Sequence, residues 1–219
     1  MAARIYTSAI ERLNALPEVF TGSELTTLFG WKSAIASSYL AQWRRAGLIK
    51  SLGGRSDVHM NLLRNRQVNP DLALHRAFPR AVKVGVDMLR AAGWTTQIPT
   101  RPEVAVPQSS SRFSIAGFDL TTRSDKWFSV VQPGIERGVH GIDRLKPAWA
   151  LVDMIHRARD RRIKHAWLLD PEDLDLESVR NNKHLATALQ AFDLPADCLL
   201  DNGYETLYDK FAQSVPRNA

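Results

Sequence analysis

Short polar side chains and cations recur between Lys32 and Arg45, and together they could hydrogen-bond to the base edges and phosphates of a nucleic acid. Apolar residues recur in the same stretch at roughly helical spacing, which predicts a helix over Ser33–Ala46 with one packed face. We expect the packed face to consist of Ala34, Tyr39, Leu40 and Trp43, and the free face of Ser33, Ser37, Ser38, Gln42 and Arg45. A helix of this kind could sink its hydroxyl and amide groups into a major groove.

The flanking residues predict the elements that would position this helix. Ser23–Gly30 is expected to be a short helix with Ser23 as its N-cap and a glycine at its left-handed end. On the other side, Gly47–Leu52 and Asp57–Leu63 flank a glycine turn with Arg55 at its tip, which is the pattern of a β-hairpin.

A further helix is expected over Ala3–Leu16, where it could cover the other two from behind and would end at Pro17. Helix, turn, helix and hairpin in this order predict a winged helix-turn-helix domain in residues 1–66. The alternative is a small structural helical module with a hairpin.

Within this domain we expect double-stranded DNA to be contacted by eight residues. Those near base edges or flanking phosphates are Lys32, Ser33, Ser37, Ser38 and Gln42, and those mainly on the backbone are Arg44, Arg45 and Arg55. Arg64 and Arg66 could add phosphate contacts or could be solvated surface cations.

The rest of the chain predicts a second domain of α+β class in residues 80–219, joined by a proline-containing linker at 67–79. We expect a helix-flanked, mainly antiparallel sheet. The expected helices are Arg80–Ala92, Pro147–His156, Asn182–Phe192 and Tyr204–Gln213. The expected strands are Thr95–Pro99, Glu103–Pro107, Arg112–Thr122 and Lys126–Val131.

Composition limits the classes of protein and of partner. The chain of 219 residues has a formal charge of +6 and a pI of about 9.7. Residues 1–66 carry 9 Lys and Arg against 4 Asp and Glu, and residues 67–168 carry 16 against 9, whereas residues 169–219 carry 4 against 10. The basic part favours an anionic partner, and the acidic end would point elsewhere or simply be a solvated face.

The single cysteine, Cys198, excludes an internal disulfide and a cysteine-based zinc site. No stretch has the length and hydropathy of a signal peptide or a membrane span. We therefore expect a soluble, cytoplasmic protein.

Catalytic and cofactor signatures are missing from the sequence. It contains no phosphate-binding or dinucleotide-binding glycine motif, no H-E-x-x-H pair and no G-x-S-x-G turn. The six histidines are scattered, and the acidic run Asp170–Glu177 lacks the order of an EF-hand loop. We therefore expect neither a cofactor nor a metal, and the basic run Arg157–Lys164 is expected to be a solvated helix end or a nucleic-acid contact.

A helix followed by strands also suggests a restriction-nuclease core, which would hold a catalytic metal with acids and a lysine on adjacent strands. Glu103 and Asp119 are the only acids on the predicted strands, and neither is followed by an acid-x-lysine pair. We therefore interpret the second domain as non-catalytic.

The fold order, the run Arg144–Ile155 and the acidic segment Asp170–Leu176 resemble the AbiEi family of antitoxins and transcriptional regulators over nearly the full length. The resemblance implies a bacterial protein encoded beside a nucleotidyltransferase toxin. It further implies that the winged helix represses their shared promoter while the C-terminal domain counteracts the toxin.

Three hypotheses follow. The first is a DNA-binding antitoxin and transcriptional autorepressor. The second is a DNA-processing enzyme with a nuclease-like second domain, which would cleave DNA in the presence of magnesium or manganese. The third is a one-component regulator whose second domain senses a small ligand.

Overall fold

Residues 8–110, 113–138, 141–159, 168–175 and 182–214 are described by the computed structural model. Their contacts divide the chain into two compact units. Unit 1 contains residues 8–81, 113–116 and 141–142, and unit 2 contains the remaining described residues. Each unit has its own sheet, so the chain is an α+β protein.

Unit 1 begins with three short helices whose ends follow local capping rules. They are α1 (Ala9–Ala15), α2 (Gly22–Phe29) and α3 (Ser33–Arg45). The N-cap of α2 is Thr21, which exchanges two hydrogen bonds with Glu24 in a capping box. The sequence-based choice of Ser23 as the N-cap is therefore wrong, because Thr21 has the glutamate three residues after it that completes the box. Gly30 ends α2 at φ 63°, as expected.

Three short strands form the antiparallel sheet of unit 1, in the order β1-β3-β2. They are β1 (Val19–Thr21), β2 (Ile49–Ser51) and β3 (Val58–Asn61). The predicted hairpin corresponds to β2 and β3, which pair in the register Lys50↔Met60. The strand β1 was not predicted, since three residues between a proline and a helix cap carry too little periodicity to identify a strand.

The helices pack their apolar faces against one another and against this sheet. The buried core of unit 1 includes Leu13, Leu16, Phe20, Leu25, Ala36, Leu40, Trp43 and Ile49. On α3 the buried stripe is Ala36, Leu40 and Trp43, at spacings of four and three. Tyr39 is half-buried and Ala34 is exposed, so the prediction that Ala34 packs is wrong.

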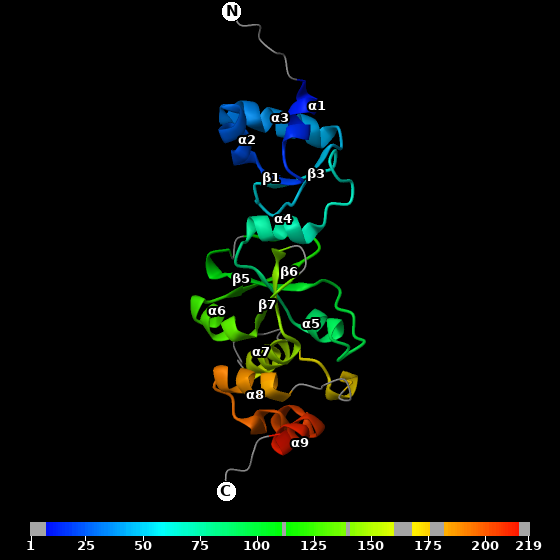
Figure 1. The fold of residues 1–219 in the computed structure, drawn as a ribbon, viewed down its shortest axis with the longest axis vertical. Helices are drawn as coiled ribbons and strands as arrows, with labels where there is room; N and C mark the ends of the chain where they lie inside the picture. The colour runs from blue at the N-terminus through cyan, green and yellow to red at the C-terminus, as the bar shows by residue number, and fades with distance from the viewer. Residues whose placement is uncertain (1–7, 111–112, 139–140, 160–167, 176–181, 215–219) are drawn as a thin grey trace, which may run out of the picture. The chain divides into compact units, whose positions relative to one another are not determined.

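The stretch predicted as a linker instead contains the helix α4 (Pro70–Ala77), which packs on β1 and β3. Asn69 caps it by accepting a hydrogen bond from the Asp71 N–H, and Pro70 occupies its first turn. In Figure 1, α4 covers the face of the sheet opposite to α1, α2 and α3. Unit 1 therefore runs to Ala81 rather than ending at residue 66.

Unit 2 is built on a five-stranded sheet in the order β6-β5-β4-β8-β7. The strands are β4 (Val82–Val84), β5 (Glu103–Pro107), β6 (Asp119–Arg123), β7 (Ile135–Arg137) and β8 (Asp143–Leu145). β4 pairs antiparallel with β5 but parallel with β8, β5 pairs parallel with β6, and β7 pairs antiparallel with β8. The sheet is therefore mixed, and the expectation of a mainly antiparallel sheet is wrong.

Two elements of unit 2 differ from their prediction, one in part and one completely. The expected helix Arg80–Ala92 is the strand β4 followed by the short helix α5 (Val86–Ala91), because Gly85 at φ 73° breaks the chain direction between them. The expected strand Lys126–Val131 is the helix α6 (Asp125–Val131), which begins at the N-cap Ser124. The expected strand Thr95–Pro99 contributes only an isolated bridge between Thr95 and Leu174.

The remaining helices agree with expectation. They are α7 (Pro147–Arg159), α8 (Asn182–Ala191) and α9 (Glu205–Ser214). Residues Ala148–Ile155 of α7 are buried throughout, and α7, α8 and α9 lie successively farther from the sheet (Figure 1). Single 3-10 turns connect these elements at Gln108–Ser110, Gln132–Gly134, Pro171–Asp173, Ala196–Cys198 and Leu200–Asn202. In the described part of the chain, no helix combines the length and apolar character that crossing a bilayer requires.

Candidate nucleic-acid interface

All eight predicted contact residues lie at the surface of unit 1. Seven are on α3 or at its start, and Arg55 is in the turn between β2 and β3. Each is exposed, whereas the stripe of Ala36, Leu40 and Trp43 on the opposite side of α3 is buried. The helix therefore presents a polar face while its apolar face is anchored in the core.

The six of these residues that lie within α3 do not all face one direction. Successive residues of an α-helix are about 100° apart. Ser38, Gln42 and Arg45 therefore lie almost opposite the buried stripe and point most directly outward. Ser33, Ser37 and Arg44 form a second row along the flank of the helix.

Ser33 and Ser37 of the flank row line a small hollow of about 280 Å³ between α3 and the start of α2. Four hydroxyl side chains line the hollow, those of Ser23, Thr26, Ser33 and Ser37. Thr26 donates to the Ser23 carbonyl oxygen at 2.7 Å, and the Ser23 hydroxyl lies 2.9 Å from that of Thr21. Among the described residues, the Ser33 and Ser37 hydroxyls have no hydrogen-bond partner, so they are available to a ligand.

Asp57 connects the hairpin to the start of α2. Its Oδ2 accepts the Ser23 N–H at 2.9 Å, and its carbonyl oxygen accepts the Gly22 N–H at 3.0 Å. A Cβ at position 22 would lie 2.4 Å from Asp57 Oδ1, so a larger residue there would displace this carboxylate. Gly22 and Asp57 were not predicted as site residues, because a hydrogen bond between residues 34 positions apart leaves no local pattern in the sequence.

The turn between β2 and β3 adopts an unusual backbone. Gly53, Gly54 and Arg55 all have positive φ, at 88°, 58° and 67°. The Ser56 N–H closes the turn on the Gly53 carbonyl oxygen at 2.9 Å. A left-handed conformation costs a non-glycine residue about 1–2 kcal/mol. Arg55, whose side chain is exposed, adopts this conformation at the turn tip.

Below this turn, His59 is buried on β3. Burial lowers the pKa of His59, and the nearby Asp57 carboxylate, 3.9 Å from Nε2, partly opposes that effect. The imidazole is therefore neutral at pH 7, packed 5.6 Å from the ring of Phe20.

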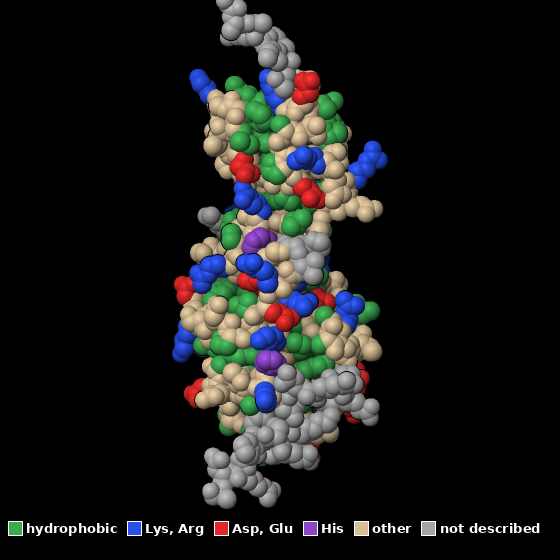
Figure 2. Space-filling view, viewed as in Figure 1, with side chains coloured by type: hydrophobic (Ala, Val, Ile, Leu, Met, Phe, Trp, Pro, Cys, Tyr) green, Lys and Arg blue, Asp and Glu red, His purple; other side chains and the backbone are tan. Residues whose placement is uncertain are grey.

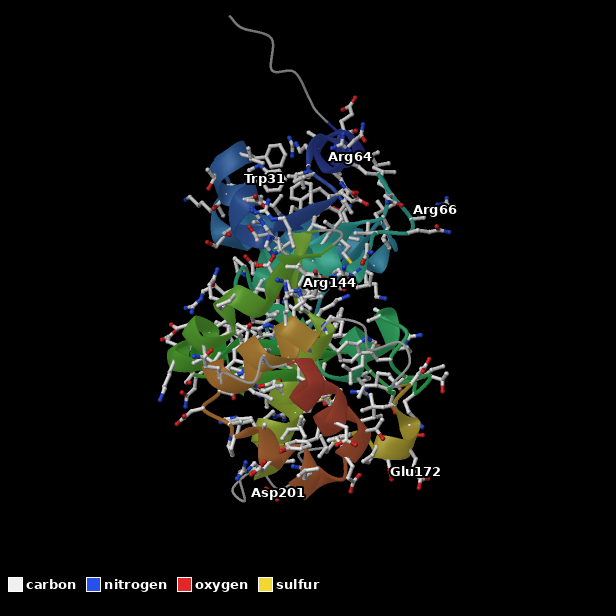
Figure 3. All side chains as sticks on the ribbon, turned by 60° about the horizontal axis from the view of Figure 1, so that its bottom comes forward. Trp31, Arg64, Arg66, Arg144, Glu172 and Asp201 are labelled. Carbon is white, nitrogen blue, oxygen red and sulfur yellow. The ribbon has the colours of Figure 1, made fainter. Side chains whose placement is uncertain are left out.

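An aromatic cluster holds the turn between α2 and α3. Trp31 stacks on Tyr39 with ring centroids 4.4 Å apart, and Phe29 lies 4.8 Å from Trp31. Arg12 of α1 donates to the Tyr39 hydroxyl at 2.7 Å and lies over the Trp31 ring. Figure 3 shows Trp31 beside the ribbon of unit 1. These contacts fix where α3 begins, and hence the orientation of Lys32 and Ser33.

Two other cations of unit 1 differ in their surroundings. Arg64 donates to the Leu16 carbonyl oxygen at 3.2 Å, so it has a structural role. Arg66 is exposed and extends away from the ribbon in Figure 3. On the face drawn in Figure 2, cations and carboxylates are interspersed on each unit rather than gathered in one block.

The acids considered for a nuclease centre are indeed neighbours in unit 2. Glu103 and Asp119 are register partners on the parallel strands β5 and β6. Glu103, however, is ion-paired with Arg157 and lies 3.7 Å from Arg123. Arg123 also pairs with the buried Asp153, which accepts the Trp127 indole N–H at 2.7 Å. Glu103 and Asp153 are thus balanced by guanidinium groups.

Within the described ranges, no group of three or more His, Cys, Asp and Glu side chains is arranged to hold a metal ion. In the acidic run, Asp170 caps the 3-10 turn Pro171–Asp173 by accepting the Glu172 N–H at 3.3 Å. Glu177 and most of the basic run, residues 160–164, lie outside the described residues. Arg157, the first residue of that run, is ion-paired with Glu103.

Comparison with known proteins does not identify a function for this site. No family model matches the chain, and no curated protein does so either. Among solved structures, the chain is similar to the RV2827C protein from Mycobacterium tuberculosis, with 16% sequence identity and a TM-score of 0.49. The match covers 95% of this chain and 80% of that one. The function must therefore be argued from this chain's own residues.

Proposed function

We propose that unit 1 is a winged helix-turn-helix domain that binds double-stranded DNA. In this proposal α3 is the recognition helix and the β2–β3 hairpin is the wing. The observation that supports it best is the exposed polar face of α3 beside a hairpin with Arg55 at its tip. A helix is about 10–12 Å across with its side chains, and the major groove is about 12 Å wide, so α3 would fit.

The two rows on α3 would make different contacts with DNA. Ser38 and Gln42 face outward and would meet base edges, where an amide can pair with adenine in two hydrogen bonds. Ser33 and Ser37, on the flank beside α2, would meet phosphates, together with Lys32, Arg44, Arg45 and Arg55. Base contacts give sequence discrimination and phosphate contacts give salt-dependent affinity.

This division predicts different effects for two substitutions. Gln42→Ala should lower affinity for the operator by about 1–3 kcal/mol and relax its sequence preference, because a base contact is lost. Ser37→Ala should weaken binding to all sequences by a smaller and equal factor. Gel-shift titrations with DNA from upstream of the protein's own gene, and with a scrambled duplex, measure both.

The matched control is Arg137→Ala, which removes an exposed cation from β7 in unit 2. It should leave both titrations unchanged. If Gln42→Ala and Ser37→Ala also left both unchanged, α3 would not be the recognition helix.

We further propose, from the resemblance to AbiEi regulators, that the protein represses its own promoter and counteracts a cognate nucleotidyltransferase toxin. The separate second unit, with its acidic C-terminal end, is consistent with a second, protein-directed role. Co-expression with a nucleotidyltransferase encoded by the adjacent gene tests this proposal. Growth should be restored by the full chain, and no rescue would refute the antitoxin role while leaving DNA binding intact.

A further inference from the structure

The free surface of α3 carries a large aliphatic side chain among its polar groups. Among the residues of α3, all of which the structure describes, Ile35 is the one large aliphatic side chain that is exposed, at 45% of its surface. It belongs neither to the buried core of unit 1 nor to the half-buried residues that pack against that core. Single exposed aliphatic side chains are common on proteins, so the position of Ile35 decides whether it has a role.

Ile35 shares its side of the helix with the residues proposed to meet base edges. At about 100° per residue, Ile35 lies about 20° around the helix axis from Gln42 and about 60° from Ser38. The exposed methyl group of Ala34 lies beside it, almost opposite the buried stripe. The serine-lined hollow is on the other flank. The first turn of α3 therefore presents methyl groups, and the later turns a hydroxyl and an amide group, to the same partner.

In the major groove, an aliphatic side chain distinguishes bases by their methyl groups. Thymine carries a C5 methyl group there, whereas cytosine presents an N4 amino donor. An aliphatic group packs favourably on a methyl group, but it would exclude water from the amino donor without accepting its hydrogen bond. Recognition helices contact base edges mainly with residues near their N-terminus, and Ile35 is the third residue of α3.

We propose that Ile35 contacts the C5 methyl group of thymine and so selects a T·A pair in the operator. The proposal rests on the assignment of α3 as the recognition helix. Ile35 and Gln42 are seven residues apart, which is about 10.5 Å along the helix axis. With α3 lying along the groove, at about 3.4 Å per base-pair step, this thymine is about three steps from the base that Gln42 contacts.

Replacement of thymine by uracil tests the contact, because uracil lacks only the C5 methyl group and keeps the hydrogen-bonding groups of thymine. The duplex from upstream of the protein's own gene is prepared once with thymine and once with uracil, and each is titrated with the full chain by fluorescence anisotropy. Wild type should bind the uracil duplex at least about fourfold more weakly, since burial of one carbon contributes about 0.8 kcal/mol. Ile35→Ala should bind the thymine duplex more weakly than wild type does and should lose most of the difference between the two duplexes.

Ile10→Ala is the matched control, because it makes the same substitution at an exposed isoleucine of α1. It should respond to uracil as wild type does. Both isoleucines are exposed, so neither substitution should prevent folding. Replacement of single thymines by uracil then locates the contacted base, whose effect should be absent only in Ile35→Ala.

The outcomes separate this inference from the proposed function. If wild type binds the thymine and uracil duplexes equally, or if Ile35→Ala keeps the full wild-type response to uracil, the methyl contact is refuted while DNA binding stands. If wild type binds neither duplex, the proposed function itself is refuted, and the methyl contact with it.

Discussion

At the scale of single residues, the proposed contact residue Arg55 combines an exposed cation with a backbone conformation that costs stability. Its left-handed backbone would suit glycine, yet Arg55 carries an exposed cation in the turn between β2 and β3. Arg55 was predicted as a contact residue from the glycine turn around it. Its positive φ was not predicted, because it depends on the closing hydrogen bond between Ser56 and Gly53.

Two substitutions at position 55 separate strain from charge. Arg55→Gly and Arg55→Ala both remove the cation, so both should weaken DNA binding equally. Only glycine relieves the strain, so the free energy of unfolding of Arg55→Gly should exceed that of Arg55→Ala by about 1 kcal/mol. Urea denaturation measures the difference, and equal stabilities would show that the positive φ stores no strain.

His59 predicts a dependence of stability on pH. Because burial lowers the pKa of His59 below its ordinary value of 6.5, the unfolded chain binds the proton more readily than the folded one. The stability associated with the neutral imidazole is therefore present above pH 6.5 and is lost as pH falls through the lowered pKa. Substitution by a side chain that does not titrate should flatten this part of the curve.

The measurement is the urea midpoint of wild type and His59→Gln across this pH range. Packing against Phe20 changes the absolute stability of the variant, so the slope is compared rather than the midpoint itself. Identical slopes would contradict the assignment to His59.

At the scale of elements, helices with a strong apolar face could be predicted from the sequence. Elements that depend on contacts between residues far apart in the chain could not. The helices α3 and α7 were predicted correctly because their buried residues are numerous and periodic. The strand β4 was taken for a helix because its valines run directly into the apolar residues of α5, and only the pairing with β5 and β8 reveals it. The same limit applied to the proposed DNA-binding site. The exposed face of α3 could be recognised, but the link from Asp57 to α2 could not.

That link predicts the effect of removing the Asp57 carboxylate. Asp57→Ala leaves the Ser23 N–H without its acceptor, which should cost about 1 kcal/mol of stability, as for other helix caps. It should also weaken DNA binding, although Asp57 is itself an acid, because the wing loses its attachment to α2. Asp57→Asn, which retains an acceptor oxygen, should recover most of both effects.

Urea denaturation and gel-shift titration of the two variants measure these effects. Tighter DNA binding by Asp57→Ala would indicate that repulsion between Asp57 and phosphate outweighs its role in positioning.

At the scale of the whole molecule, we propose DNA binding for unit 1, while unit 2 has a pocket of its own, of about 620 Å³. The charge asymmetry of the sequence agrees with this division of labour, since the first 66 residues carry a net positive charge and the last 51 a net negative one. The domain boundaries were only partly predictable, because α4 and residues 113–116 and 141–142 are packed into unit 1 from later in the chain. Contacts of that kind leave no trace in local composition.

The salt dependence of DNA binding tests the central claim most directly. Four cations, Lys32, Arg44, Arg45 and Arg55, are proposed to meet phosphates, so log K against log salt concentration should have a slope of about −3.6. In fluorescence-anisotropy titrations with the upstream DNA of its own gene, Arg55→Gly should reduce that slope by about 0.9, and Arg137→Ala should not change it. Absence of binding to this duplex, or a slope that none of the four cations affects, would contradict the account.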